Sequence, residues 1–220
     1  MKRRALLLAG AGLALLPSGA FATTVADAVF GANLIGAVKE PEQFHYAYEM
    51  TGDTLQQPVT SDWLMEVRKI DPDGGKEVYF ELFSGSDQRH FGPISAREQN
   101  PLVLVFLQRD VAAMSNLTGG AQGYFQQQIR RKFSEAAESE QIEIEVDGKK
   151  VPATKLVMHP FRDDPSIMRF PKYKEKAYEF IVSPEVPGGV YRLASSTPDP
   201  ATGKVILAET VTFSHVGGQK

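Results

Sequence analysis

The sequence contains no cysteine among its 220 residues. Disulfide scaffolds, thiolate-bound zinc or iron–sulfur centres and thiol nucleophiles are therefore excluded. A formal net charge of −3 provides no basic footprint for nucleic acid. A hydrophobic fraction of 42% against 23% charged residues is also too high for a disordered chain. We therefore expect a folded chain of one or at most two domains that does not bind nucleic acid.

Sequence motifs for common catalytic chemistry are missing as well. The chain has no G-x-S-x-G, S-x-x-K, H-E-x-x-H or G-K-[ST] motif. The glycine-rich segment 119–123 is not followed by Lys-Ser or Lys-Thr, which favours a turn between helices over a phosphate-binding loop. Neither H-x-H nor H-x-x-x-H spacing occurs among the four histidines, which are His45, His90, His159 and His215. We predict no metal and no cofactor.

The N-terminus has the layout of a secretory signal peptide. Basic residues 2–4 precede an apolar run over residues 5–16, and small residues lead to a cleavage point after Ala22. The apolar run is too short for a hydrocarbon core of about 30 Å, although an N-terminal anchor is the alternative. No cysteine follows for lipid attachment. We expect residues 1–22 to be removed, leaving residues 23–220 as one periplasmic β-rich domain that does not span a membrane.

Short runs of alternating apolar and polar residues predict most of the chain to be β-strand. The runs cover residues 44–50, 63–68, 78–83, 142–146, 150–159, 178–182, 191–193 and 205–213. Tight turns join three pairs of them, at residues 71–75, at Asp147-Gly148 and at residues 198–203. Such short connections predict antiparallel pairing.

The periodicity becomes helical in the middle of the chain. Asn100-Pro101 is a helix start signal, and apolar residues then recur at helical spacing as far as Met114, although residues 102–107 could also begin a buried strand. A second, amphipathic helix follows from Phe125 to Ala136. We predict an α+β fold: a curved antiparallel sheet, or incomplete barrel, of about eight or nine strands with a helical insertion at about residues 101–137. Residues 25–38 are weakly helical, and residues 160–174 are expected to be a loop.

Many large apolar side chains share the predicted strand and helix faces. One interpretation is a plain core between sheet and helices. The other is a cavity under a helical lid, with methionines suited to variable apolar ligands. The candidate ligand-binding residues are Phe44, Tyr46, Tyr48, Trp63, Met65, Phe80, Leu82, Phe106, Met114 and Phe125. The candidate polar anchors are Tyr46, Arg109, Tyr124 and Arg130.

The C-terminal third carries a family resemblance. Residues 178–191 read Tyr-Glu-Phe-Ile-Val-Ser-Pro-Glu-Val-Pro-Gly-Gly-Val-Tyr, and a Pro-Asp-Pro-Ala-Thr-Gly loop and a long last strand follow. This order of strand, proline-marked turn and two strands around a polar loop resembles the periplasmic lipoprotein-carrier (LolA/LolB-like) superfamily. The resemblance is architectural and covers about residues 40–215. It implies an incomplete antiparallel barrel whose concave face holds acyl chains or another lipid.

We therefore expect an exported, soluble, non-enzymatic protein that binds or carries a hydrophobic, lipid-like ligand. Its partners would be a hydrophobic small molecule or acyl chain, and a periplasmic or membrane protein. The alternative is a periplasmic protein-interaction module without a small-molecule ligand. A hydrolase that uses His159 with Asp163 or Asp164 would require those side chains to meet in one cleft.

Overall fold

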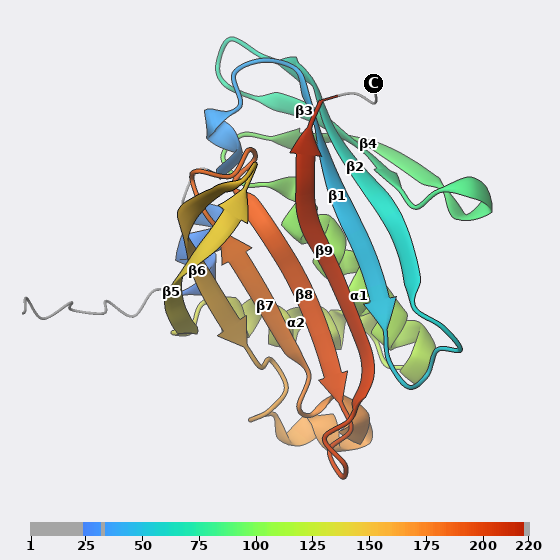
Figure 1. Cartoon of the computed structure of the whole chain (residues 1–220). Coiled ribbons are helices and arrows are strands. Elements are labelled where there is room, and N and C mark those ends of the chain that lie inside the picture. The colour runs from blue at the N-terminus through green and yellow to red at the C-terminus, as the bar shows by residue number, and fades with distance from the viewer. Residues whose placement is uncertain (1–23, 32–33, 218–220) are drawn as a thin grey trace, which may run out of the picture.

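The computed structural model describes residues 24–31 and 34–217. The predicted signal peptide, residues 1–22, lies outside the described residues. In the described part of the chain, nine strands form one antiparallel sheet (Figure 1). The strands are β1 (Glu42–Thr51), β2 (Val59–Ile70), β3 (Lys76–Leu82), β4 (Arg89–Ala96), β5 (Glu138–Val146), β6 (Lys149–Met158), β7 (Ala177–Val182), β8 (Val190–Pro198) and β9 (Val205–Val216).

The sheet is open, and its two edges are the strands on either side of the helical insertion. The strand order is β4-β3-β2-β1-β9-β8-β7-β6-β5. Strands that pair in the sheet are also consecutive in the chain, with the exception of β1 and β9. The pairing of β1 with β9 places Tyr46 opposite Phe213. The last strand therefore joins an N-terminal half-sheet to a C-terminal one. The prediction of an incomplete antiparallel barrel with eight or nine strands is confirmed, with nine.

The tight turns connect the strands as the sequence predicted. Residues 71–75 join β2 to β3, and Asp147-Gly148 joins β5 to β6, with Asp147 in the left-handed conformation that such a turn requires. The strand β4 was not among the predicted runs. The expected loop at 160–174 contains two short 3₁₀ helices, η4 (Pro165–Arg169) and η5 (Pro171–Tyr173). The weakly helical N-terminal stretch forms a π-helical turn η1 (Asp27–Gly31) and a 3₁₀ turn η2 (Leu34–Ala37).

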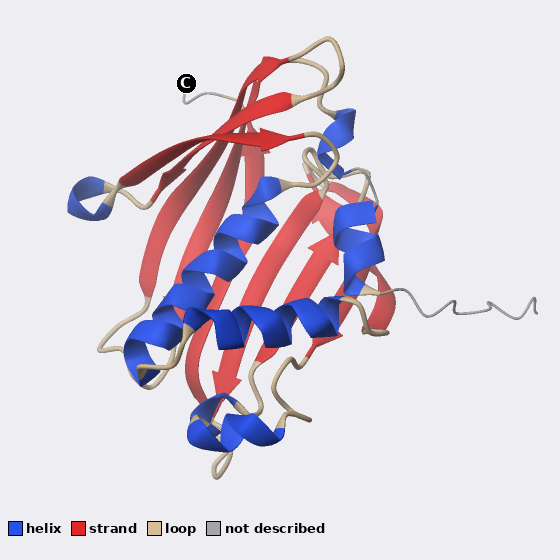
Figure 2. Ribbon diagram, turned by 180° about the vertical axis from the view of Figure 1, so that it is seen from behind, coloured by secondary structure: helices blue, strands red, loops and turns tan. Residues whose placement is uncertain are grey.

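The two long helices lie across one face of the sheet, as Figure 2 shows. They are α1 (Pro101–Thr118) and α2 (Gln122–Phe133), inserted between β4 and β5. The Asn100 side chain caps α1 by accepting a hydrogen bond from the Leu102 N–H at 2.9 Å. Gly119 ends α1 in the left-handed conformation, with φ of 69°. The glycine-rich segment is thus the predicted turn between helices, and residues 102–107 are helical.

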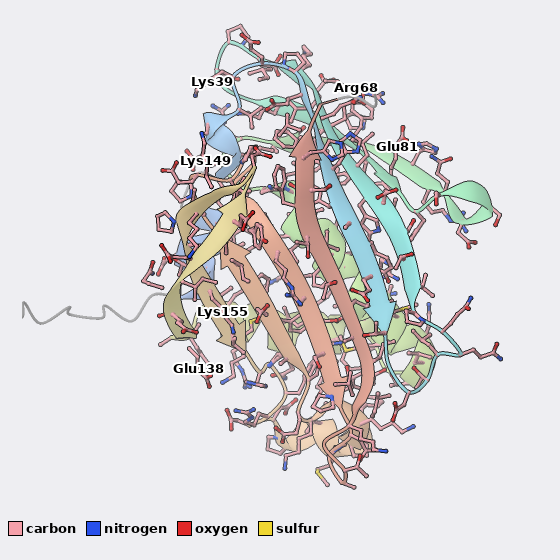
Figure 3. All side chains as sticks on the ribbon, in the orientation of Figure 1. Lys39, Arg68, Glu81, Glu138, Lys149 and Lys155 are labelled. Carbon is pink, nitrogen blue, oxygen red and sulfur yellow. The ribbon has the colours of Figure 1, made fainter. Side chains whose placement is uncertain are left out.

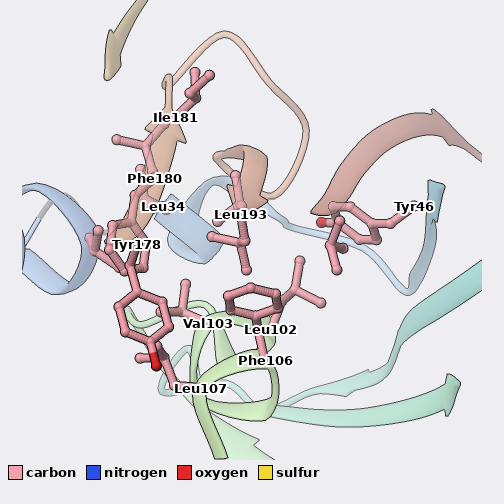
Figure 4. Close-up of a cluster of buried hydrophobic side chains, with 14 of the residues drawn as sticks. Leu34, Tyr46, Leu102, Val103, Phe106, Leu107, Tyr178, Phe180, Ile181 and Leu193 are labelled. Carbon is pink, nitrogen blue, oxygen red and sulfur yellow. The ribbon is translucent and has the colours of Figure 1, made fainter. Parts of the chain in front are cut away.

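The core lies between α1 and the covered face of the sheet. Phe106 of α1 belongs to this core together with Tyr46 of β1, Phe180 of β7 and Leu193 of β8 (Figure 4). The opposite face of the sheet is polar, and Figure 3 shows charged side chains over it, including those of Arg68 and Glu81. This asymmetry explains the alternating sequence pattern, because each strand turns one row of side chains to the helices and the other to water.

The turn between β7 and β8 packs closely against Leu34 of the N-terminal segment, and this contact can be tested. Gly189 has φ of 78°, and a Cβ there would lie 2.3 Å from the Leu34 Cβ of η2. Gly148 has a similar φ of 73° with nothing within 4 Å. We expect Gly148→Ala to cost about 1 kcal/mol of unfolding free energy, from backbone conformation alone. Gly189→Ala should cost at least about twice as much in urea unfolding, and equal losses would show that the contact with Leu34 is unimportant.

Candidate functional site

An open cavity of about 910 Å³ lies along α1, bounded by β3, β4, α2 and η1. Twelve of its seventeen lining residues are apolar, and none of the described residues that line it is acidic. The apolar ones are Phe30, Leu82, Phe83, Phe91, Ile94, Leu104, Val105, Leu107, Val111, Ala112, Ile129 and Phe133. The polar ones are Arg89, Gln108, Arg109, Gln126 and Arg130. A cavity with apolar walls and a few polar groups is typical of small-molecule binding sites.

The helix α1 has apolar side chains on two sides, and this makes the cavity. Val103 and Phe106 are buried in the core, whereas Leu104 and Ala112 line the cavity. Leu104 is 48% exposed, which is high for a large apolar side chain in the middle of a helix. A helix that only covered a sheet would need one apolar stripe and would be polar elsewhere. The second apolar side of α1 is therefore not explained by packing within the fold.

A buried ion pair holds α1 on the sheet. The Lys176 ammonium, on a side chain 2% exposed, donates to the Asp110 carboxylate of α1 at 3.0 Å and to the Thr197 hydroxyl at 3.3 Å. The Tyr178 hydroxyl of β7 donates to the second Asp110 oxygen. Burial, together with the Asp110 charge, raises the pKa of Tyr178 well above its usual value. The Asp110 carboxylate and the Lys176 ammonium thus both have partners when α1 lies in this position on the sheet, and this pairing holds the helix there.

Arg109 connects the cavity to the centre of the sheet. Its guanidinium donates to the Glu209 carboxylate of β9 and, at 2.9 Å, to the Tyr48 hydroxyl of β1. The guanidinium carbon also lies 5.1 Å from the ring centroids of Tyr48 and Phe83, within the range of cation–π attraction. Burial, and then the Glu209 charge, raises the pKa of Tyr48. The charge of Arg109 is therefore already balanced by a buried carboxylate.

Phe83 takes an unusual backbone conformation at the cavity wall. It follows β3 directly and has φ of 63°, a left-handed value that is an outlier for a bulky residue. Its ring meets those of Tyr48 and Trp63 edge-on, with centroid separations of 5.2 and 5.9 Å. The ring thus contacts two core side chains of the sheet and also lines the cavity. No sequence pattern signalled this residue.

The predicted ligand-binding residues lie mainly in the core. All ten are buried, and of them only Leu82 lines the cavity. The other nine are Phe44, Tyr46, Tyr48, Trp63, Met65, Phe80, Phe106, Met114 and Phe125, which belong to the packed core. Their contact with a ligand stays a prediction.

The four predicted anchors divide evenly. Arg109 and Arg130 line the cavity, whereas Tyr46 and Tyr124 do not. Tyr124 is engaged elsewhere, because its hydroxyl donates to the Asp164 carboxylate at 2.6 Å. The Tyr46 hydroxyl is buried in the core without a hydrogen-bond partner among residues 24–31 and 34–217. Sequence reasoning missed the β4 side of the cavity because that strand was not predicted.

The residues of the hydrolase hypothesis have separate structural partners. Asp164 accepts from the Ser166 N–H at the start of η4, and Asp163 accepts from Lys132 at 3.2 Å. The buried Nδ1 atom of His159 has no partner within the described part of the chain, and burial lowers the pKa of this imidazole. The three side chains form no hydrogen-bonded catalytic unit.

The described residues contain no group of three or more His, Cys, Asp or Glu side chains placed to hold a metal ion. None of their helices is long and apolar enough to cross a membrane.

The chain was compared with known proteins. No family model matches it, and no curated protein sequence does. Among solved structures it is similar to the lipoprotein LppX of Mycobacterium tuberculosis, with 11% identity and a TM-score of 0.37 over 86% of this chain and 93% of the other. It is also similar to a LolA superfamily protein from Nitrosomonas europaea, with 10% identity and a TM-score of 0.24 over 90% and 94%.

A third similar structure is a DUF1329 family protein from Desulfovibrio piger, with 10% identity and a TM-score of 0.27 over 88% of this chain and 93% of the other. A LolA superfamily protein is thus among the similar structures.

The buried ion pair provides a stability test. Lys176→Met leaves the Asp110 charge buried without its cation, and we expect a loss of about 3–5 kcal/mol in urea unfolding. The control is Lys155→Met, which removes a partly exposed pair with Glu179 at 3.4 Å and should cost less than about 1 kcal/mol. The double variant Asp110→Leu, Lys176→Met should recover much of the loss. No recovery would mean that the charge is not the cause.

Proposed function

We propose that this protein binds and carries a hydrophobic, lipid-like molecule in the cavity along α1, without catalysing a reaction. The observation that carries the proposal is an open, apolar-walled cavity of about 910 Å³. This volume is near the upper end of the range of small-molecule sites, roughly 300–1,000 Å³. Apolar side chains are exposed in the cavity, and exposed apolar surface of this kind marks a binding site.

The expected ligand has a long chain for an energetic reason. Each buried methylene group contributes about 0.8 kcal/mol, so a dodecyl chain gains on the order of 10 kcal/mol. Association itself costs about 4–15 kcal/mol. A longer hydrocarbon chain therefore gains more free energy from this cavity than a short one does.

The signal-peptide layout of residues 1–22 and the absence of cysteine support a soluble protein exported to the periplasm. A carrier in that compartment receives its ligand from a membrane or from another protein and passes it on, so a protein partner is part of the proposal. The exposure of Leu104 also suits the alternative, a protein-interaction module whose partner covers the same wall. The ligand experiment below separates the two.

Two leucines of α1 give a matched pair of variants. Leu104 lines the cavity, whereas Leu117, which is 71% exposed, does not. Leu104→Glu places a carboxylate in the apolar wall, where a ligand would have to desolvate it. We expect binding of the neutral dye Nile red, followed by its fluorescence, to weaken at least about tenfold in this variant. Leu117→Glu makes the same change outside the cavity and should bind like the unaltered protein.

Solvent extraction of the purified protein, followed by mass spectrometry, should also release an apolar molecule. Absence of extracted ligand together with absence of Nile red binding would overturn the carrier function and favour the interaction module. Equal loss of binding in both variants would show that the dye does not occupy this cavity.

A further inference from the structure

We propose that the cavity selects ligands whose hydrocarbon chain ends in an anionic headgroup, with Arg89 and Arg130 as the groups that recognise it. This inference rests on the proposed function and adds the chemistry of the ligand's polar end. Carboxylate and phosphate are the two headgroups that share this chemistry.

The charge of the cavity is opposite to that of the chain. Its lining contains three arginines and no acidic residue among the described ones, whereas the whole chain has a formal charge of −3. If these arginines only kept the protein in solution, acidic residues would be expected among them. A low-dielectric apolar wall beside uncompensated positive charge strengthens attraction for an anion.

The polar groups of the lining differ in whether the fold already satisfies them. Arg109 is paired with the buried Glu209. Gln108 and Gln126 hydrogen-bond to each other at 2.9 Å, linking α1 to α2 across the cavity. These three residues therefore need no ligand. The unmatched charges of the lining are those of Arg89 and Arg130.

Arg130 stands out among the basic residues that end α2. The other two are paired: Arg131 lies 3.8 Å from Glu135, and Lys132 contacts Glu135 at 2.8 Å and Asp163 at 3.2 Å. Arg130 has no ion pair with any residue in the described ranges, and it is the one of the three that lines the cavity. Of these three basic side chains, the one without an ion pair is thus the one that lines the cavity.

Arg89 plays the corresponding part on β4. Its guanidinium donates to the Gln88 carbonyl oxygen at 2.9 Å, and no carboxylate of the described chain pairs with it. Arg89 and Arg130 are both exposed, so each can hold an anion at the rim without the cost of burying a charge. Apolar side chains stand beside each of them, Phe91 on β4 and Ile129 on α2. An acyl chain can thus lie on the apolar wall while its headgroup meets an arginine.

The test compares four ligands with one chain length and different headgroups. Dodecanoate, dodecyl phosphate, dodecanol and dodecyltrimethylammonium are titrated below micelle formation into the full-length mature protein by isothermal titration calorimetry. We expect the two anions to bind at least about tenfold more tightly than dodecanol, and the cation to bind most weakly. Tighter binding of dodecyl phosphate would indicate a phospholipid-type source, and tighter binding of dodecanoate a fatty acid. Added salt should weaken the anions alone.

Three arginine substitutions locate the effect. Arg89→Gln and Arg130→Gln should each reduce the preference for dodecanoate over dodecanol, and the double variant should abolish it. The control Arg131→Gln removes the same charge from the adjacent position of α2, outside the cavity, and should keep the preference. If one single variant alone abolishes the preference, the headgroup is assigned to that arginine.

Three results would overturn the inference. Equal binding of dodecanoate and dodecanol would reject an anionic headgroup and leave the hydrophobic carrier intact. An anion preference that survives the double variant, or that Arg131→Gln removes equally, would reject the assigned arginines. Failure of all four ligands and of Nile red would instead reject the carrier function itself.

Discussion

The position of α1 depends on one buried carboxylate. Asp110 is satisfied only when Lys176 and Tyr178, which arrive from a different part of the chain, meet it under the helix. Moving the helix would leave buried charges without partners, a cost comparable to a large share of the stability of a small domain. The core on one side of α1 and the cavity on the other therefore share a fixed wall. A rigid wall keeps the cavity open although its side chains are apolar.

Local features of the sequence predicted the parts of the fold that local interactions determine. Asp147-Gly148 and the Asn100 cap act within a few residues, and their predictions are confirmed. The strand β4 escaped prediction because it is an edge strand with Gly92-Pro93 in its middle. Proline is tolerated there, since an edge strand forms ladder bonds on one side only.

The candidate site was predictable only in part, because sequence periodicity shows that a side chain is apolar but not what it will contact. The strand faces of Phe44 or Trp63 are apolar because they form the core, whereas Leu104 is apolar on the opposite side of a helix. The pairing of Asp110 with Lys176, 66 residues apart, also leaves no local signal. Arg109 of α1 and Arg130 of α2 were predicted as anchors from their positions near the aromatic faces, and both line the cavity. Their contact with a ligand stays a prediction.

The central place of β9 has a consequence for how the chain acquires its structure. Every other strand of this sheet is synthesised earlier, yet β1 can find its second neighbour only when β9 has emerged. Until then the N-terminal and C-terminal half-sheets each present an unsatisfied edge, and the final closure joins segments at nearly opposite ends of the sequence. The sheet can therefore be completed only after all nine of its strands have been synthesised.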